Sequence, residues 1–247
     1  MIGAERTSEI DGTRLTYRVA GSGPALVLIH GLAGSSRWWA RNLGPLSERF
    51  TVYAVDLLGF GASRGQQFVM AESAGLLARW LDALRIEHAG LVGHSLGGLI
   101  ALDLAAEHPK LIARLVLVDA AIFAPGERPL RYAVNLLRQG RYTPLDFVPV
   151  VARDVARCGP RAILAASRGL LHGDPRRNVP QLRQPALLIW GEHDVVVPLS
   201  VGEELTTLLP EARLVVLPGA GHNPMWDRPE AFNALVLDFL APASTSG

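Results

Sequence analysis

The sequence predicts an α/β domain with a mostly parallel central sheet of about eight strands and helices on both faces. The first observation is a series of short apolar runs of strand length that do not alternate with polar residues. Strands of a parallel sheet are covered on both faces and are therefore continuously apolar. The second observation is that helix-compatible segments separate these runs, which is typical of doubly wound domains with right-handed crossovers.

The expected elements follow one another along almost the whole chain. Two short β-rich runs come first, and six continuous apolar runs follow. The expected strands lie at 8–10, 14–19, 25–29, 51–55, 89–92, 115–118, 186–190 and 213–217. The expected core helices lie at 37–48, 69–84, 96–107, 200–209 and 229–240. Because ligands of such sheets bind at the carboxyl ends of the strands, motifs that follow a strand are the candidates for function.

One long segment interrupts the alternation. Residues 123–184 contain seven prolines and helix-like pieces but no clear sheet strand. We expect a helical cap here, inserted after the sixth strand into a core of residues 1–122 and 185–241, with a frayed tail at 242–247. The segment has eleven arginines against four acidic residues, a net charge of about +7. A solvated basic surface is the simpler interpretation. The alternative is binding of an anionic substrate or a partner.

Composition limits the possible functions and partners. The chain has 247 residues and a formal net charge of +1, so it has no global attraction to nucleic acid or to an anionic membrane. Its single cysteine cannot form an internal disulfide, which fits a reducing compartment. We see no signal peptide and no apolar stretch of transmembrane length. We therefore expect a cytoplasmic protein that acts on a small molecule, without nucleic-acid binding or membrane insertion, and of undetermined oligomeric state.

The most informative motif lies between the expected strand 89–92 and the expected helix 96–107. Residues 93–97 read Gly-His-Ser-Leu-Gly. A G-x-S-x-G pattern in this setting indicates a strained turn that presents the Ser95 hydroxyl away from the backbone. Side chains two positions before and after the serine would clash, and Gly93 and Gly97 remove them. The motif predicts a nucleophilic serine, provided that a base and an orienting acid lie elsewhere.

Two later strand ends supply candidates for these partners. Asp194 follows the expected strand 186–190, and His222 follows 213–217, which is the order nucleophile, acid, histidine. Glu192 and Asp119 compete with Asp194 because each also lies near a strand end. We favour Asp194 as the acid, Glu192 as a solvated turn residue and Asp119 as a structural residue.

Together these motifs resemble those of the α/β-hydrolase superfamily, in its capped serine esterase branch. The matching residues are His30-Gly31, 56–63, 93–98, 191–194 with Pro198, and 221–224 with Pro229-Glu230. The resemblance implies that Ser95 is the nucleophile, His222 the base and acid, and Asp194 the orienting carboxylate. It also implies an oxyanion hole made by the backbone amides of Leu32 and Leu96.

Further expectations concern the substrate pocket and cofactors. We expect the pocket to be lined by Gly31, Trp38, His94, Phe123, Val196 and Asn223. No cofactor is expected, and no metal, because no grouping of His, Asp and Glu has convincing metal-ligand spacing.

The expected reaction is hydrolysis of carboxylic esters of small to medium acyl groups through an acyl-enzyme on Ser95. Haloalkane dehalogenases and epoxide hydrolases of the superfamily place an aspartate there, which argues against those reactions. Lactone hydrolysis and carbon–carbon hydrolysis of ring-cleavage products are alternatives. Ring-cleavage hydrolases usually have a tryptophan where this chain has Asn223, and Gly-Pro-Gly where it has 32–34. A receptor-like ligand-binding protein with slow or no turnover is the alternative from a different class.

Overall fold

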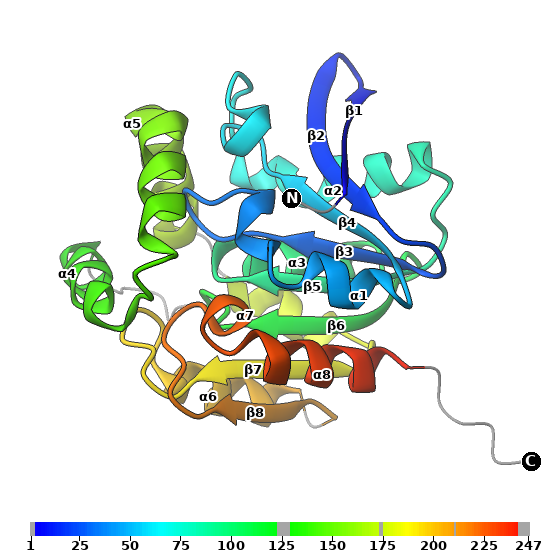
Figure 1. Ribbon diagram of the computed structural model, residues 1–247. Coiled ribbons are helices and arrows are strands. Elements are labelled where there is room, and N and C mark those ends of the chain that lie inside the picture. Colours follow the sequence, from blue (N-terminus) through cyan, green and yellow to red (C-terminus); the bar gives the residue numbers. More distant parts are fainter. Residues whose placement is uncertain (1–2, 123–128, 173–174, 210, 242–247) are drawn as a thin grey trace, which may run out of the picture.

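The computed structural model describes residues 3–122, 129–172, 175–209 and 211–241. Its centre is one eight-stranded sheet with the order β1-β2-β4-β3-β5-β6-β7-β8 (Figure 1). β2 pairs antiparallel with both β1 and β4, and the other neighbours pair in parallel. The strands are β1 (Ala4–Ile10), β2 (Thr13–Ala20), β3 (Ala25–Ile29), β4 (Thr51–Asp56), β5 (Ala89–His94), β6 (Ile112–Val118), β7 (Ala186–Gly191) and β8 (Arg213–Leu217). The prediction of a mostly parallel α/β fold is confirmed.

Helices cover both faces of the sheet, and the sheet separates two hydrophobic cores. The core helices are α1 (Leu43–Ser47), α2 (Met70–Ala83), α3 (Leu96–Glu107), α6 (Leu199–Leu208), α7 (Pro224–Asp227) and α8 (Pro229–Leu240). Successive residues of β3 point to opposite faces: Val27 and Ile29 join the core under α2 and α3, whereas Leu26 and Leu28 join the core under α1 and α8. Both faces of the strand are therefore apolar, which explains its continuously apolar sequence.

The expected helix at 37–48 is wrong as a single element. The structure has a short 3₁₀ helix, η1 (Ser36–Trp39), followed by a turn and then α1. Pro45 lacks an N–H, so a continuous helix would lose one backbone hydrogen bond there. The Asn42 side chain in the intervening turn donates to the Met225 carbonyl at 3.0 Å and to Asn233 at 2.8 Å. Tertiary contacts thus replace the missing helical turn.

Helices make up much of the described part of the segment between β6 and β7. It contains α4 (Pro129–Gln139), η3 (Gly140–Tyr142), α5 (Val148–His172) and η4 (Pro175–Gln181), and α4 and α5 stand beyond the carboxyl ends of the strands (Figure 1). α5 is kinked at Gly159, where φ is +75° just before Pro160. The residues 123–128 at the start of the expected cap, and the expected tail 242–247, lie outside the described residues. Within the described ranges, no helix is long and apolar enough to cross a membrane.

Candidate active site

Ser95 occupies a strained turn between β5 and α3. Its φ of +52° and ψ of −116° lie in a region that L-residues rarely adopt. A Cβ on Gly93 would lie 2.7 Å from the Ala101 side chain, and a Cβ on Gly97 would lie 2.6 Å from the His30 carbonyl oxygen. Both distances are shorter than real Cβ contacts, so the backbone can pack this closely only with glycine at these two positions.

Ser95, His222 and Asp194 form one continuous hydrogen-bonded chain. The Nε2 atom of His222 lies 3.1 Å from Ser95 Oγ, and its Nδ1 atom lies 2.7 Å from Asp194 Oδ2. The three residues come from the carboxyl ends of β5, β8 and β7 and are all buried. The structure therefore brings together the three residues that the sequence analysis selected, at distances suited to proton transfer.

The turn after β7 orients Asp194. Its Oδ1 accepts the backbone N–H groups of Val196 at 2.7 Å and Val197 at 3.0 Å. This leaves Oδ2 to face His222. Glu192, the competing carboxylate in the same turn, is half-exposed and instead accepts the Gly219 N–H at 2.8 Å. Only Asp194 is thus placed to accept the Nδ1–H of the imidazole.

Asp119, the second competing acid, is buried behind this turn with φ at +42°. Its Oδ1 accepts the Gly191 N–H at 2.9 Å and so ties the end of β7 to the end of β6. Burial and, secondarily, the neighbouring Asp194 charge raise the pKa of Asp119 well above its ordinary value. Asp119 thus joins two strand ends, whereas Asp194 is the carboxylate that faces His222.

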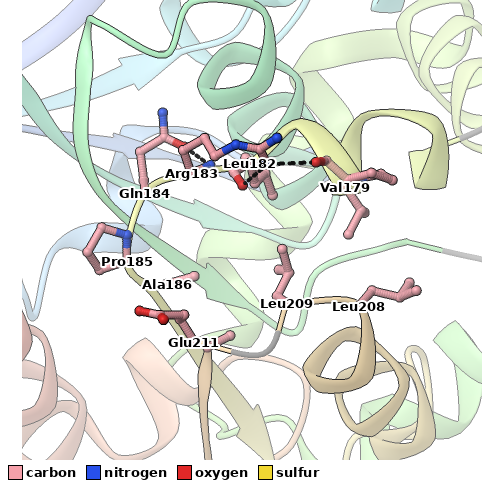
Figure 2. Close-up of a pocket in the computed structure, with 11 residues that line it drawn as sticks. Val179, Leu182, Arg183, Gln184, Pro185, Ala186, Leu208, Leu209 and Glu211 are labelled. Atoms are coloured by element: carbon pink, nitrogen blue, oxygen red, sulfur yellow. Dashed lines mark hydrogen bonds between the residues drawn. The ribbon is translucent and has the colours of Figure 1, made fainter.

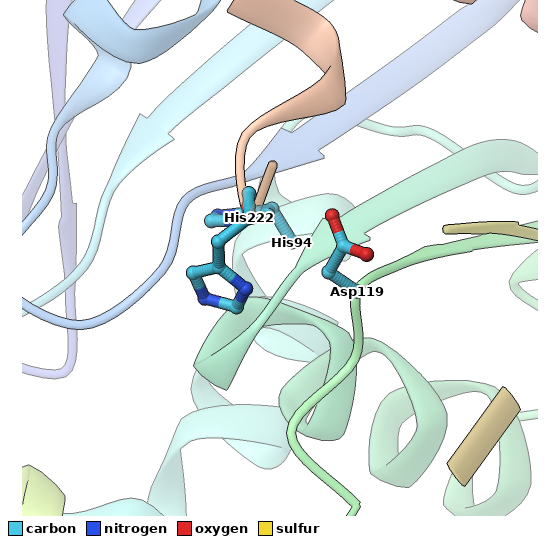
Figure 3. Close-up of side chains that lie close together, drawn as sticks. All are labelled: His94, Asp119 and His222. Atoms are coloured by element: carbon cyan, nitrogen blue, oxygen red, sulfur yellow. The ribbon is translucent and has the colours of Figure 1, made fainter. Parts of the chain in front are cut away.

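His94, Asp119 and His222 lie close together (Figure 3), with one possible ligand atom of each within 4.8 Å of the others. The grouping is a poor metal site because both ring nitrogens of His222 already face Asp194 and Ser95. His94 is fully buried, and its Nε2 lies 2.7 Å from the His222 carbonyl oxygen. Burial lowers the pKa of His94 well below its ordinary value. This ring has no exposed surface and supports the His222 backbone, and its expected place in the pocket wall stays a prediction.

The expected oxyanion hole lies where β3 approaches α3. Leu96 begins α3, so its amide has no acceptor within the helix. Opposite it, a Cβ on Gly31 would lie 3.1 Å from the Ser95 side chain. His30 holds this loop, because its Nδ1 lies 2.7 Å from the Gly31 carbonyl and its Nε2 accepts the Leu57 N–H at 3.0 Å. Leu32 follows in the loop and is partly buried.

The other expected pocket residues lie around this centre. Val196 and Asn223 are buried next to Asp194 and His222, and Asn223 Oδ1 has no hydrogen-bond partner among the residues that the structure describes. Trp38 is buried with its ring 5.7 Å from that of His94. Phe123 lies outside the described residues.

Sequence reasoning missed two polar side chains that hold the loops of the triad. Gln139, at the end of α4, accepts the Val195 N–H at 3.2 Å, and a Cβ on Gly221 would collide with its amide nitrogen. Asp227, in α7, accepts the Gly221 N–H at 2.8 Å, and burial raises its pKa to about 6. Gln139 carries no local sequence signal, whereas Asp227 lies only six residues from Gly221.

A cavity of about 350 Å³ lies at the amino-terminal ends of β7 and β8, away from the triad (Figure 2). Pro185 and Ala186 line it at the start of β7, and Glu211 and Ala212 line it just before β8. Ser95 lies at the carboxyl ends of the strands. This cavity is therefore not the site at which an acyl group would reach the serine.

Comparisons with known proteins agree with the fold and the motifs. The model of the alpha/beta hydrolase family matches residues 26–235. A 2-hydroxy-6-oxo-6-phenylhexa-2,4-dienoate hydrolase of Burkholderia cepacia is 30% identical, over 92% of this chain and 91% of that protein. A putative carbamate hydrolase of Escherichia coli is 30% identical, over 88% of this chain and 91% of its own length. The crystal structure of an enol-lactonase from Burkholderia xenovorans LB400 superposes with a TM-score of 0.81 at 27% identity, covering 95% and 99% of the two chains.

The chain belongs to the alpha/beta hydrolase family. The family and the similarity to hydrolases over almost the whole chain identify it as a hydrolase.

Proposed function

We propose that the protein is a serine hydrolase that cleaves carboxylic esters of small to medium acyl groups through an acyl-enzyme on Ser95. The observation that carries the proposal is the hydrogen-bonded chain from Ser95 through His222 to Asp194. A serine hydroxyl becomes nucleophilic when an oriented imidazole accepts its proton. Here Ser95 lies in a strained turn, and the His222 imidazole faces Asp194 through Nδ1 and Ser95 through Nε2.

The proposed reaction has the following steps. His222 Nε2 takes the Ser95 proton as Oγ attacks the ester carbonyl, and Asp194 stabilises the imidazolium through Nδ1. The amides of Leu32 and Leu96 donate to the developing oxyanion. His222 then protonates the leaving alcohol and activates a water molecule, which hydrolyses the acyl-enzyme. Gly31, Val196 and Asn223 form the walls around the acyl group.

Ser95→Ala tests this assignment. It should abolish hydrolysis of p-nitrophenyl butyrate because no other hydroxyl replaces the nucleophile, while the thermal unfolding temperature stays close to that of the wild type. Asp119→Asn is the matched control at the same sheet edge and should retain activity within about tenfold. Turnover by Ser95→Ala at the wild-type rate would overturn the proposal. A single burst without further turnover by the wild type would favour a receptor-like protein.

A second candidate is hydrolysis of ring-cleavage products or lactones. It is supported by the two Burkholderia proteins, one named as a hydrolase of a phenylhexadienoate and the other as an enol-lactonase. All of these reactions can use the same serine and oxyanion hole, so the substrate discriminates between them. A panel of p-nitrophenyl esters, an enol-lactone and a ring-cleavage dienoate separates them by kcat/KM. The highest value for the esters is expected.

A further inference from the structure

A second cavity, distinct from the one in Figure 2, lies where the cap helix α5 meets the core. It has a volume of about 340 Å³. Arg18 of β2, Arg37 of η1, Arg64 after η2 and Arg157 of α5 all line it. Four arginines from four separate segments thus line one small space. Like charges repel at this range, and the repulsion disappears when an anion binds between them.

Acidic side chains compensate only part of this charge. Arg18 pairs with Glu5 at 3.0 Å, and Arg37 lies 3.8 Å from the buried Asp154. Arg64 and Arg157 are exposed and have no ion pair within the part of the chain that the structure describes. Two of the four arginines in the wall therefore lack an ion-pair partner among the described residues, and the arginines outnumber the acidic residues Glu5 and Asp56 that also line the cavity.

The remaining carboxylate in the wall is committed to the backbone. Asp56 accepts the Ser36 N–H at 2.5 Å and the Ala62 N–H at 2.8 Å. It therefore shapes the floor of the cavity and makes no ion pair with Arg64 or Arg157, although its charge offsets part of theirs. The wall also includes the Ser36 residue itself, whose hydroxyl can donate to an anion.

We propose that this cavity binds the phosphate group of a small molecule. Guanidinium groups recognise phosphate oxygens through paired, charge-assisted hydrogen bonds, and Arg64 and Arg157 have no ion-pair partner among the described residues that would compete for these bonds. None of the residues that line the cavity belongs to the candidate triad. The proposed site is thus separate from Ser95 and does not depend on the proposed reaction.

A neighbouring cavity supplies room for an organic part of the ligand. It has a volume of about 650 Å³, and Arg64 lines both cavities. Phe68 and Ala162 are among its apolar lining residues, on the core and on α5 respectively. A phosphate group in the first cavity could therefore carry an apolar substituent that extends into the second.

A ligand held here would join the cap to the core beside the triad. Arg157 lies on α5 one helical turn from Asp154, whose Oδ2 accepts Ser35 Oγ at 2.6 Å and Trp38 Nε1 at 3.2 Å. Trp38 in turn packs against His94, which holds the His222 backbone. Binding of phosphate should therefore slow amide hydrogen exchange in α5 around residues 150–158.

Isothermal titration calorimetry on the full chain tests the proposal, with inorganic phosphate and phenyl phosphate as probes in chloride buffers of constant ionic strength. We expect saturable binding that Arg64→Gln and Arg157→Gln each weaken by at least about tenfold. Arg49→Gln is the control, because it removes the same charge from an exposed residue. Arg49 lies near the start of β4, whereas the cavity lies at the end of that strand, at Asp56. If phenyl phosphate binds more tightly than inorganic phosphate, the ligand of the cavity is an organic phosphate. If the two bind with equal affinity, the ligand is free phosphate.

Absence of saturable binding of both probes would overturn the proposal. It would equally be overturned if Arg49→Gln weakened binding as much as Arg64→Gln. Ester hydrolysis measured without phosphate should be unchanged in Arg64→Gln and Arg157→Gln. A wild-type protein that binds phosphate but hydrolyses no ester would contradict the proposed reaction alone.

Discussion

Replacing Gly97 with alanine should push α3 away from the end of β3. The new Cβ would lie 2.6 Å from the His30 carbonyl oxygen and closer still to that of Ile29, whereas ordinary contacts begin at 3.4 Å. Backbone must therefore move by roughly 0.8 Å or more, because neither obstacle is the end of a flexible side chain. Such overpacking costs about 1–3 kcal/mol of the free energy of unfolding.

The same displacement separates the Leu96 amide from the loop that carries Leu32. A misplacement of about 1 Å in an active site can lower the rate about 100-fold, so kcat for p-nitrophenyl butyrate should fall by that factor. Urea unfolding reports the stability change in parallel. Gly65→Ala is the matched control because a Cβ at that position would meet no atom within 4 Å. If Gly97→Ala and Gly65→Ala had equal kcat, close approach of β3 and α3 would not be needed for the reaction.

Three further predictions test the groups around the triad. Asp194→Asn should lower kcat for the same ester by roughly 10⁴-fold, because the amide orients the wrong tautomer of His222, and a loss below tenfold would contradict its assignment as the orienting acid. Because the pKa of Asp227 rises from 3.8 to about 6 on folding, the native state keeps a proton that the unfolded state loses between these values. This group's contribution to the free energy of unfolding should therefore fall by about 2 kcal/mol as pH rises from 4 to 6, and urea titrations should show a smaller fall in Asp227→Asn. Gln139→Ala leaves the Val195 N–H without its acceptor, so urea unfolding should show a loss of about 1 kcal/mol, and kcat should fall while Gly140→Ala keeps wild-type values.

The strands from β3 to β8 could be predicted because each is a short, mostly apolar run of residues. Leu26 and Leu28 face one core while Val27 and Ile29 face the other. The run at 25–29 is apolar because both faces of the strand are buried. The turn at Ser95 could also be predicted from the sequence. Its glycines, Gly93 and Gly97, are required by contacts within a few residues or with the end of the adjacent β3.

Contacts across the chain could not be predicted in this way. Asp154 reaches Ser35, 119 residues away, and Gln139 reaches Val195, 56 residues away. Neither residue lies in a motif, because any polar side chain at the right place in the fold would serve. The break at Asn42 has the same origin, since its partners Met225 and Asn233 lie near the other end of the sequence. Local sequence patterns predict burial and turns. The roles of Asp154, Gln139 and Asn42 depend instead on partners that are distant in the sequence.

The long sequence separation within the candidate triad also has a kinetic consequence. Ser95 and His222 are 127 residues apart, and they meet only when β5, β6, β7 and β8 are paired side by side. Contacts of this kind form late, because a long loop must close before they are made. During refolding from urea, hydrolytic activity should therefore return after most of the far-ultraviolet circular dichroism. The rate at which hydrolytic activity returns would then measure the rate of the last step of sheet assembly.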